Sequence, residues 1–375
     1  MNISTLDELI LDVALTEVAT PRRVAVLDDP SGDLLRSVLG WEGLDAVLLG
    51  SRTIDQARTA KQIIGDAPGL VRVAGVDGPL HVGEFLAEPL DLVIGQVPKS
   101  LEETAYIAAA VAARGGVLVI GANNKHMDRG HNATLADYFS DVRASRGRGK
   151  FRALIARGEP TGRTYAPAVG NTEAGPLFGV GGVFSGADED PGGQFLAVEA
   201  IKELISEIQA RRDAATSWDS WERPAERERT DLEVVDLGCG NGSVALAILD
   251  ALPDATVVAT DSHADAVVSA SLTLREFVEA GRARVTWDDA AGDEEEGSAD
   301  VVLLNPPFHD GTAIDATLVQ GLLDAARRLL RPGGRLYMVH NNHLRYRPEV
   351  EARFVRVRQV ARNPKFTVLR GDLAT

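Results

Sequence analysis

One short segment, Asn305-Pro306-Pro307-Phe308-His309, carries side chains whose types and spacing suit chemistry. The Asn305 side-chain oxygen and the Pro306 backbone carbonyl are hydrogen-bond acceptors, and consecutive prolines fix φ and leave no competing N–H. Two fixed acceptors can bind both hydrogens of a planar amine and localise its lone pair for attack on an electrophile. Phe308 offers a ring face on which a base can stack, worth roughly 1–3 kcal/mol, while His309 either contacts the substrate or packs. We predict that Asn305, Pro306, Pro307 and Phe308 form the catalytic set.

A glycine-rich turn upstream predicts where the electrophile is held. In the run Leu232–Gly242, an apolar strand ends at Asp236 and is followed by Gly238, Gly240 and Gly242, and then by a helical pattern over 243–252. Glycines let the backbone turn tightly and approach a ligand, and the helix start beyond presents unpaired N–H groups. An acid at this point would repel a dinucleotide pyrophosphate. It suits the cationic methionine part of S-adenosylmethionine, which is the cofactor that we predict.

Acids at the ends of the next two strands extend this cofactor set, to which we also assign Asn305. Asp261 lies 19 residues after Gly242 (261 minus 242), a spacing typical of an acid that bonds ribose hydroxyls, and Ser262 follows it. Asp288 and Asp289 end the third strand, where a polar side chain can meet the adenine amine. The alternative is that these acids only cap helices or solvate strand ends. Cys239 has no evident partner base, so we interpret it as a small packing residue.

The elements that must position these residues alternate regularly between short apolar strands and helices. We expect strands at 24–27, 45–49, 71–74, 92–95 and 117–120, and again at 233–237, 256–260, 283–287, 301–304 and 335–340. Helical patterns stand between or beside them at 34–39, 101–113, 197–211, 264–280 and 317–330. This alternation predicts an α/β fold of two tandem Rossmann-like doubly wound domains, each with a mostly parallel sheet. We place the domains at 1–165 and 231–375, joined by a connecting segment, 166–230, whose polar end at 217–230 is a linker.

The first half keeps the strand-helix rhythm but lacks the chemical groups. Its first strand is followed by Asp28-Asp29-Pro30-Ser31-Gly32, with one glycine rather than three, and its fourth strand by Gln96-Val97-Pro98-Lys99. We therefore expect the second half to be a class I S-adenosylmethionine-dependent methyltransferase domain. The first half is expected to be a degenerate copy of it that has lost the cofactor site and binds substrate. The substrate contacts that we expect in its arginine-rich tract are Arg146, Arg148 and Lys150.

Charge and composition limit the partners. The net charge of −16 argues against indiscriminate attraction to nucleic acid, because phosphate binding draws on Lys and Arg. Basic residues nevertheless gather at 142–163 and 343–370, which are either solvated faces or local RNA contacts. The single cysteine excludes an internal disulfide, and no apolar run approaches the roughly 18 residues that span a bilayer. We expect a cytoplasmic monomer that uses no metal.

With these motifs, the chain resembles the bacterial ribosomal RNA guanine-N2 methyltransferases that have duplicated methyltransferase-like domains. The motifs that carry the resemblance in the second half are Asp236–Gly242, Asn305–His309, Pro332-Gly333-Gly334, Asn342-His343-Leu344 and Lys365–Leu369. Those in the first half are Pro98-Lys99-Ser100, Gly121–Lys125 and Ala144–Arg148. The resemblance also implies that 182–196, with Gly182–Ser185, Asp190-Pro191-Gly192 and Gln194, covers the cofactor pocket.

The implied activity is methyl transfer from S-adenosylmethionine to N2 of a guanosine in ribosomal RNA or a ribosomal subunit. Members act on small-subunit or large-subunit RNA, and the motifs Asn342-His343-Leu344 and Lys365–Leu369 favour the large-subunit type. A guanosine in a helix would have to leave its stack to reach the site.

Two other functions stay open. Methyltransferases of release-factor glutamine use a similar Asn-Pro-Pro turn, usually followed by Tyr, on a planar amide amine. Here Phe308, His309 and the arginine-rich first half favour RNA. A non-catalytic RNA-binding or ribosome-assembly protein is the second alternative, and the intact set of Asp236, the three glycines, Asp261 and Asn305 argues against it.

Overall fold

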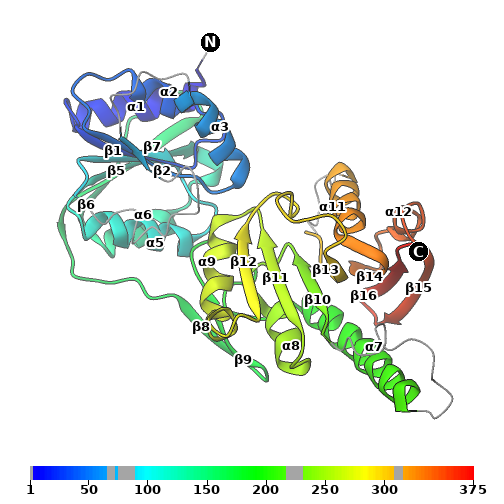
Figure 1. Cartoon of the computed structure of the whole chain (residues 1–375). Helices are drawn as coiled ribbons and strands as arrows, with labels where there is room; N and C mark the ends of the chain where they lie inside the picture. Colours follow the sequence, from blue (N-terminus) through cyan, green and yellow to red (C-terminus); the bar gives the residue numbers. More distant parts are fainter. Residues whose placement is uncertain (1–2, 66–71, 75–88, 217–230, 308–315) are drawn as a thin grey trace. The chain divides into compact units, whose positions relative to one another are not determined.

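A computed structural model describes residues 3–65, 72–74, 89–216, 231–307 and 316–375 (Figure 1). The chain divides into two compact units. The first comprises Met1–Ala168, Gly179–Gly186 and His263–Val268, and the second comprises Val169–Phe178, Ala187–Ser262 and Ser269–Thr375. The domain limits that we expect at 165 and 231, and the pocket-cover role of 182–196, stay predictions, and the expected linker at 217–230 lies outside the described residues.

The first unit is built on a seven-stranded sheet with the order β3-β2-β1-β4-β5-β7-β6. Its strands are β1 (Arg23–Leu27), β2 (Ala46–Gly50), β3 (Arg72–Ala74), β4 (Leu92–Gln96), β5 (Val117–Asn123), β6 (Phe139–Ala144) and β7 (Phe151–Pro160). β1 to β5 pair in parallel, whereas β6 and β7 are antiparallel. One face packs against α1 (Thr5–Glu17), α2 (Asp33–Leu39) and α3 (Ile54–Gly65). The other packs against α5 (Leu101–Ala112) and α6 (Arg129–Ala136), with the short helix η1 (Asn124–His126) between β5 and α6.

The second unit repeats this plan with the order β12-β11-β10-β13-β14-β16-β15. Its strands are β10 (Glu233–Leu237), β11 (Thr256–Asp261), β12 (Ala283–Trp287), β13 (Ala299–Leu304), β14 (Leu330–Asn341), β15 (Val355–Arg362) and β16 (Phe366–Asp372). α7 (Pro191–Thr216), α8 (Ser243–Ala251) and the end of α9 (Ala264–Thr273) pack on one face, and α11 (Ala316–Leu329) and α12 (Arg347–Glu351) on the other. α10 (Arg275–Glu279) follows α9, and β8 (Ala168–Thr172) pairs with β9 (Gly175–Gly179).

The predicted fold class, two doubly wound α/β sheets with a degenerate first copy, is confirmed, and the apolar runs locate the parallel strands to within a few residues. The helix expected at 264–280 is wrong in detail, because it breaks at Leu274 into α9 and α10. The helix expected at 197–211 starts earlier, at Pro191, a residue that suits the first turn of a helix because that turn needs no N–H from it.

The antiparallel strands β6, β7, β15 and β16 are absent from our sequence expectations. β15 reads Val-Arg-Val-Arg-Gln-Val-Ala-Arg and is mostly exposed at the sheet edge, so it lacks the apolar run of a buried strand. In the described part of the chain, no helix has the length and hydropathy that crossing a membrane requires.

Candidate active site

The glycine turn after β10 has the backbone that its residue types predict. Gly238, Gly240 and Gly242 have φ values of 82°, 54° and 83°, a region that side chains disfavour. A Cβ added at Gly238 or Gly240 would meet no heavy atom within 4 Å, so both positions face open space. Gly242 instead caps α8, and its Cβ would lie 3.3 Å from Ala270 of α9. The turn therefore packs against α9 at Gly242 and leaves space for a ligand at Gly238 and Gly240.

Asp236 lies beneath this turn. Its side chain is buried, and Oδ2 accepts a hydrogen bond from the Ala245 N–H in the first turn of α8 at 3.2 Å. Burial raises the pKa of Asp236 to about 7, and the nearby Asp261 carboxylate adds to the rise. Asp236 therefore stabilises the start of α8 beside the turn. A positive charge bound above the turn would lower the pKa of Asp236. Burial also raises the pKa of the Cys239 thiol, which agrees with a packing role.

The end of β11 is bonded to the glycine turn. Asp261 Oδ2 accepts from the Gly240 N–H at 3.0 Å, and the Thr260 carbonyl accepts from the Gly238 N–H at 2.9 Å. The Ser262 carbonyl accepts from Trp287 Nε1 at 2.9 Å, which joins the ends of β11 and β12. These predicted cofactor residues therefore gather along one edge of the sheet, as the carboxyl ends of parallel strands do.

Asp288 and Asp289 differ in their surroundings. Asp288 is buried, and its carboxylate accepts from the N–H groups of Asp289 at 2.6 Å and Asp293 at 2.8 Å, so it shapes its own loop. Asp289 is exposed. A cavity of about 900 Å³ runs along β10, β11 and β12 and reaches this edge at Trp287 and Asp288, but neither the glycine turn nor Asn305 lines it.

Asn305 follows β13 at the same edge. Its Nδ2 donates to Asp190 Oδ2 at 2.9 Å. Its Oδ1 is buried and accepts no hydrogen bond from any residue that the structure describes. Pro306 is buried and Pro307 is exposed, whereas Phe308 and His309, two of the predicted substrate contacts, lie outside the described residues. A buried carbonyl oxygen without a donor is costly, so Asn305 Oδ1 has the properties expected of an acceptor for a substrate amine.

The segment before α7, which the family resemblance assigns to a cover of the cofactor pocket, bonds to both the glycine turn and Asn305. Asn241 takes part in these contacts, and the sequence pattern gave its side chain no role. Asn241 Nδ2 donates to the Asp188 carbonyl at 2.9 Å, which bonds this segment to the glycine turn. At Gly192 an added Cβ would lie 3.4 Å from both Asn305 Oδ1 and the Phe366 ring. The sequence signal was Asp190 before Pro191, a helix-start pattern.

The matching place in the first unit is filled by its own side chains. Gly32 caps α2 with φ 74°, as Gly242 caps α8. However, Arg52 pairs with Asp28 at 3.2 Å and with Glu103 at 2.7 Å, and Gln56 Nε2 donates to Asp28 at 2.7 Å. The cavity left there is about 10 Å³, room for one water at most and far too small for a nucleoside.

The predicted RNA contacts in the first unit fall into two kinds. Arg148 forms ion pairs with Asp12 at 2.5 Å and Glu8 at 3.7 Å. Arg146 and Lys150 are exposed, and Lys150 Nζ lies 5.4 Å from the centroid of the Phe151 ring. Among the described residues, no group of three His, Cys, Asp or Glu side chains could hold a metal ion.

Comparisons with known proteins agree on one chemistry. Residues 224–370 match the family model described as methyltransferase small domain. The ribosomal RNA large subunit methyltransferase G of Streptomyces coelicolor is 31% identical over 322 residues, covering 82% of this chain and 77% of that protein. The protein of the same name from Pseudomonas fluorescens is 30% identical over 377 residues, covering 97% and 91%.

A solved structure supports the fold over the whole chain. The 16S rRNA N2 methyltransferase of T. thermophilus, in complex with AdoMet and guanosine, matches with a TM-score of 0.67 at 20% identity, covering 99% of this chain and 92% of that one.

Proposed function

We propose, since the chain belongs to the family of ribosomal RNA large subunit methyltransferases G, that it methylates N2 of a guanosine in large-subunit ribosomal RNA. The methyl donor is S-adenosylmethionine, and the protein acts in the cytoplasm as a monomer. The observation that carries the proposal is Asn305 Oδ1, which is buried after the carboxyl end of β13 and has no hydrogen-bond donor among the described residues. The glycine turn lies at the same edge of the sheet.

The residues present fit this cofactor. Gly238 and Gly240 leave open space above the turn, and Asp236 lies below it, where a cationic ligand would favour its charged form. Asp261, with Ser262, stands where it would receive ribose hydroxyls. Of the two acids after β12, we assign the adenine amine to Asp289, because its side chain is exposed, whereas buried Asp288 bonds its own loop.

The protein's part in catalysis is to hold the amine. Bound S-adenosylmethionine supplies an electrophilic methyl group. Asn305 Oδ1 and the Pro306 carbonyl accept the two N2 hydrogens, so that the lone pair points out of the guanine plane. Attack of N2 on that methyl group would break its bond to sulfur, and the extra proton on nitrogen would leave to water. No strong base is required, because alignment supplies much of the rate.

RNA contacts are proposed for exposed cations that have no carboxylate partner among the described residues. In the first unit we choose Arg146 and Lys150 from the arginine-rich tract, because both are exposed, whereas Arg148 is ion-paired. In the second unit, Arg362 at the end of β15 and Lys365 in the turn before β16 are exposed. Phe308 and His309 complete the expected substrate contacts.

The test is methylation of purified RNA with labelled S-adenosylmethionine. Large-subunit RNA, small-subunit RNA and a release factor are offered separately, and labelled nucleosides are identified by mass spectrometry. Label in N2-methylguanosine of large-subunit RNA supports the proposal. Label in small-subunit RNA would show that the target lies in the other subunit. Label in a glutamine of the release factor would show that the substrate is a protein. Cofactor binding without any transfer would point to a binding or assembly protein.

A further inference from the structure

Asn305 is held by a residue from outside its own turn. Asp190, 115 residues earlier in the chain, accepts the hydrogen bond from Asn305 Nδ2 at 2.9 Å. A carboxylate can only accept hydrogen bonds, whereas the two ends of an asparagine amide differ. The end that faces Asp190 must therefore be the NH₂ group. This fixes the orientation of the amide and turns Oδ1 away from Asp190, where it is buried and without a donor among the described residues.

Asp190 is itself fixed by the start of α7. The same Oδ2 accepts from the Gly193 N–H at 2.8 Å, and the Asp190 carbonyl accepts from the Gln194 N–H at 2.8 Å. This is an N-cap, followed by Pro191 at the first helical position. Gly192 and Gly193 then leave room for the asparagine, since an added Cβ at Gly193 would lie 3.4 Å from Asn305 Nδ2.

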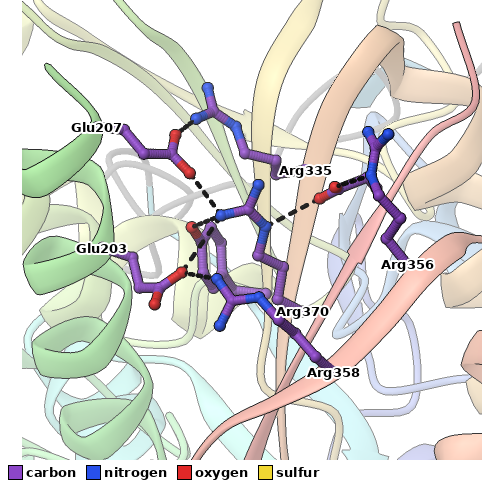
Figure 2. Close-up of polar contacts among 8 residues, drawn as sticks. Glu203, Glu207, Arg335, Arg356, Arg358 and Arg370 are labelled. Atoms are coloured by element: carbon purple, nitrogen blue, oxygen red, sulfur yellow. Dashed lines mark hydrogen bonds and ion pairs between the residues drawn. The ribbon is translucent and has the colours of Figure 1, made fainter. Parts of the chain in front are cut away.

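The position of α7 is in turn fixed on the sheet. Figure 2 shows Glu203 and Glu207 of α7 reaching the arginines of β14, β15 and β16. Arg370 pairs with Glu207 at 2.5 Å and with Glu203 at 3.2 Å, and buried Arg335 pairs with Glu207. Opposite charges that are this close and partly buried resist sliding of the helix along the sheet.

We infer that Asp190 is a positioning residue for methyl transfer: it sets the Asn305 amide so that its oxygen, and not its NH₂ group, faces the substrate amine. The inference rests on the proposed role of Asn305. Without Asp190, the amide can turn over and present two donors to an amine that also carries donors. Activity would then fall mainly through kcat, because most of the proposed contacts to RNA and cofactor come from other residues.

Three substitutions separate this role from helix capping. Asp190→Ser keeps an oxygen that can cap Gly193 but is one atom too short to reach Asn305 as well. Asp190→Asn keeps an oxygen of the original reach, and Asp190→Ala removes both bonds. Asp128→Ser is the matched control, because Asp128 caps α6 by accepting from the Gly130 and His131 N–H groups.

In full-length protein we expect Asp190→Ser and Asp190→Ala to lower kcat roughly 10- to 100-fold, with KM for RNA and cofactor within about twofold of wild type. Asp190→Asn should restore most of the rate, and Asp128→Ser should leave it unchanged. Wild-type kcat in Asp190→Ser, with Asn305→Ala inactive, would overturn the inference while leaving the proposed function intact.

A second measurement does not depend on activity. The side-chain NH₂ signals of Asn305, identified in nitrogen-15 spectra by their loss in Asn305→Ala, should be shifted and slow to exchange in wild type. In Asp190→Ser they should move to the positions of free amides. If they do not change, Asp190 does not hold the amide, whatever substrate the enzyme proves to methylate.

Discussion

Val26 in the first sheet stands where Asp236 stands in the second. Each is the fourth residue of the central strand, and each is paired on both sides within the same strand order, Val26 with Leu49 and Ile94, and Asp236 with Ala259 and Leu303. One copy of the fold thus buries a methyl-bearing side chain where the other buries a carboxylate. Together with the Arg52–Asp28 pair, this replacement predicts that only one of the two copies of the fold binds the cofactor.

One chain should therefore bind one S-adenosylmethionine. Titration calorimetry on the full-length protein should give a stoichiometry near one. A second equivalent of bound cofactor would mean that the Arg52–Asp28 pair opens and that the first unit is not degenerate.

Gly240→Ala should weaken cofactor binding at least about tenfold, because an added Cβ enters the open space above the turn at a residue with positive φ. Gly149→Ala is the matched control: its φ is 59°, its surroundings are equally open, and it lies in the turn before β7. Affinity is measured by calorimetry, and melting temperature reports the backbone penalty that both variants share. Equal cofactor affinities in the two variants would show that the glycine turn is not part of the binding site.

Asp236 should make the cofactor-free protein less stable as pH rises. Its folded pKa is about 7, raised mainly by burial, whereas an unfolded Asp titrates near 4. The native state thus keeps a proton that the unfolded state releases, so stability from this group is full below about pH 4 and is lost as pH rises through 7, by up to about 4 kcal/mol. Relative to Asp236→Asn, the wild type should lose melting temperature between pH 5 and 8. If the melting temperatures of the two proteins change with pH in the same way, burial does not raise the pKa of Asp236.

Removing Arg146 and Lys150 should weaken RNA binding more than removing Arg148, because Arg148 is already neutralised by Asp12. Loss of two phosphate contacts lowers the slope of log affinity against log salt concentration by roughly 2. The double variant Arg146→Ala/Lys150→Ala is compared with Arg148→Ala in filter-binding titrations at several salt concentrations. If the salt dependence of RNA affinity is the same in the double variant as in wild type, RNA does not contact Arg146 and Lys150.

The sequence could predict what depends on local patterns. Continuous apolar runs located the parallel strands, and glycine spacing located the turn that leaves open space at Gly238 and Gly240. Contacts between distant segments were not predictable. Asp190 and Asn305 meet only because α7 begins beside the end of β13, and nothing in either segment specifies that meeting.

Charge was the least predictable property. The tract 142–163 reads as strongly basic, but four of its arginines, Arg143, Arg148, Arg157 and Arg163, have carboxylate partners from other elements or strands. In the same way, Arg356, Arg358 and Arg370 of the second tract are paired. Only the folded structure separates cations that hold elements together from cations that are available to RNA.

We propose that Asn305 presents its oxygen to the N2 amine of a guanosine in large-subunit RNA. The most direct measurement is the amount of N2-methylguanosine at each position of that RNA in cells lacking this protein, complemented with wild type or with Asn305→Ala. We predict that one position loses its methyl group, regains it with wild type and stays unmethylated with Asn305→Ala. Full methylation with Asn305→Ala, or no position that depends on the protein, would contradict the claim.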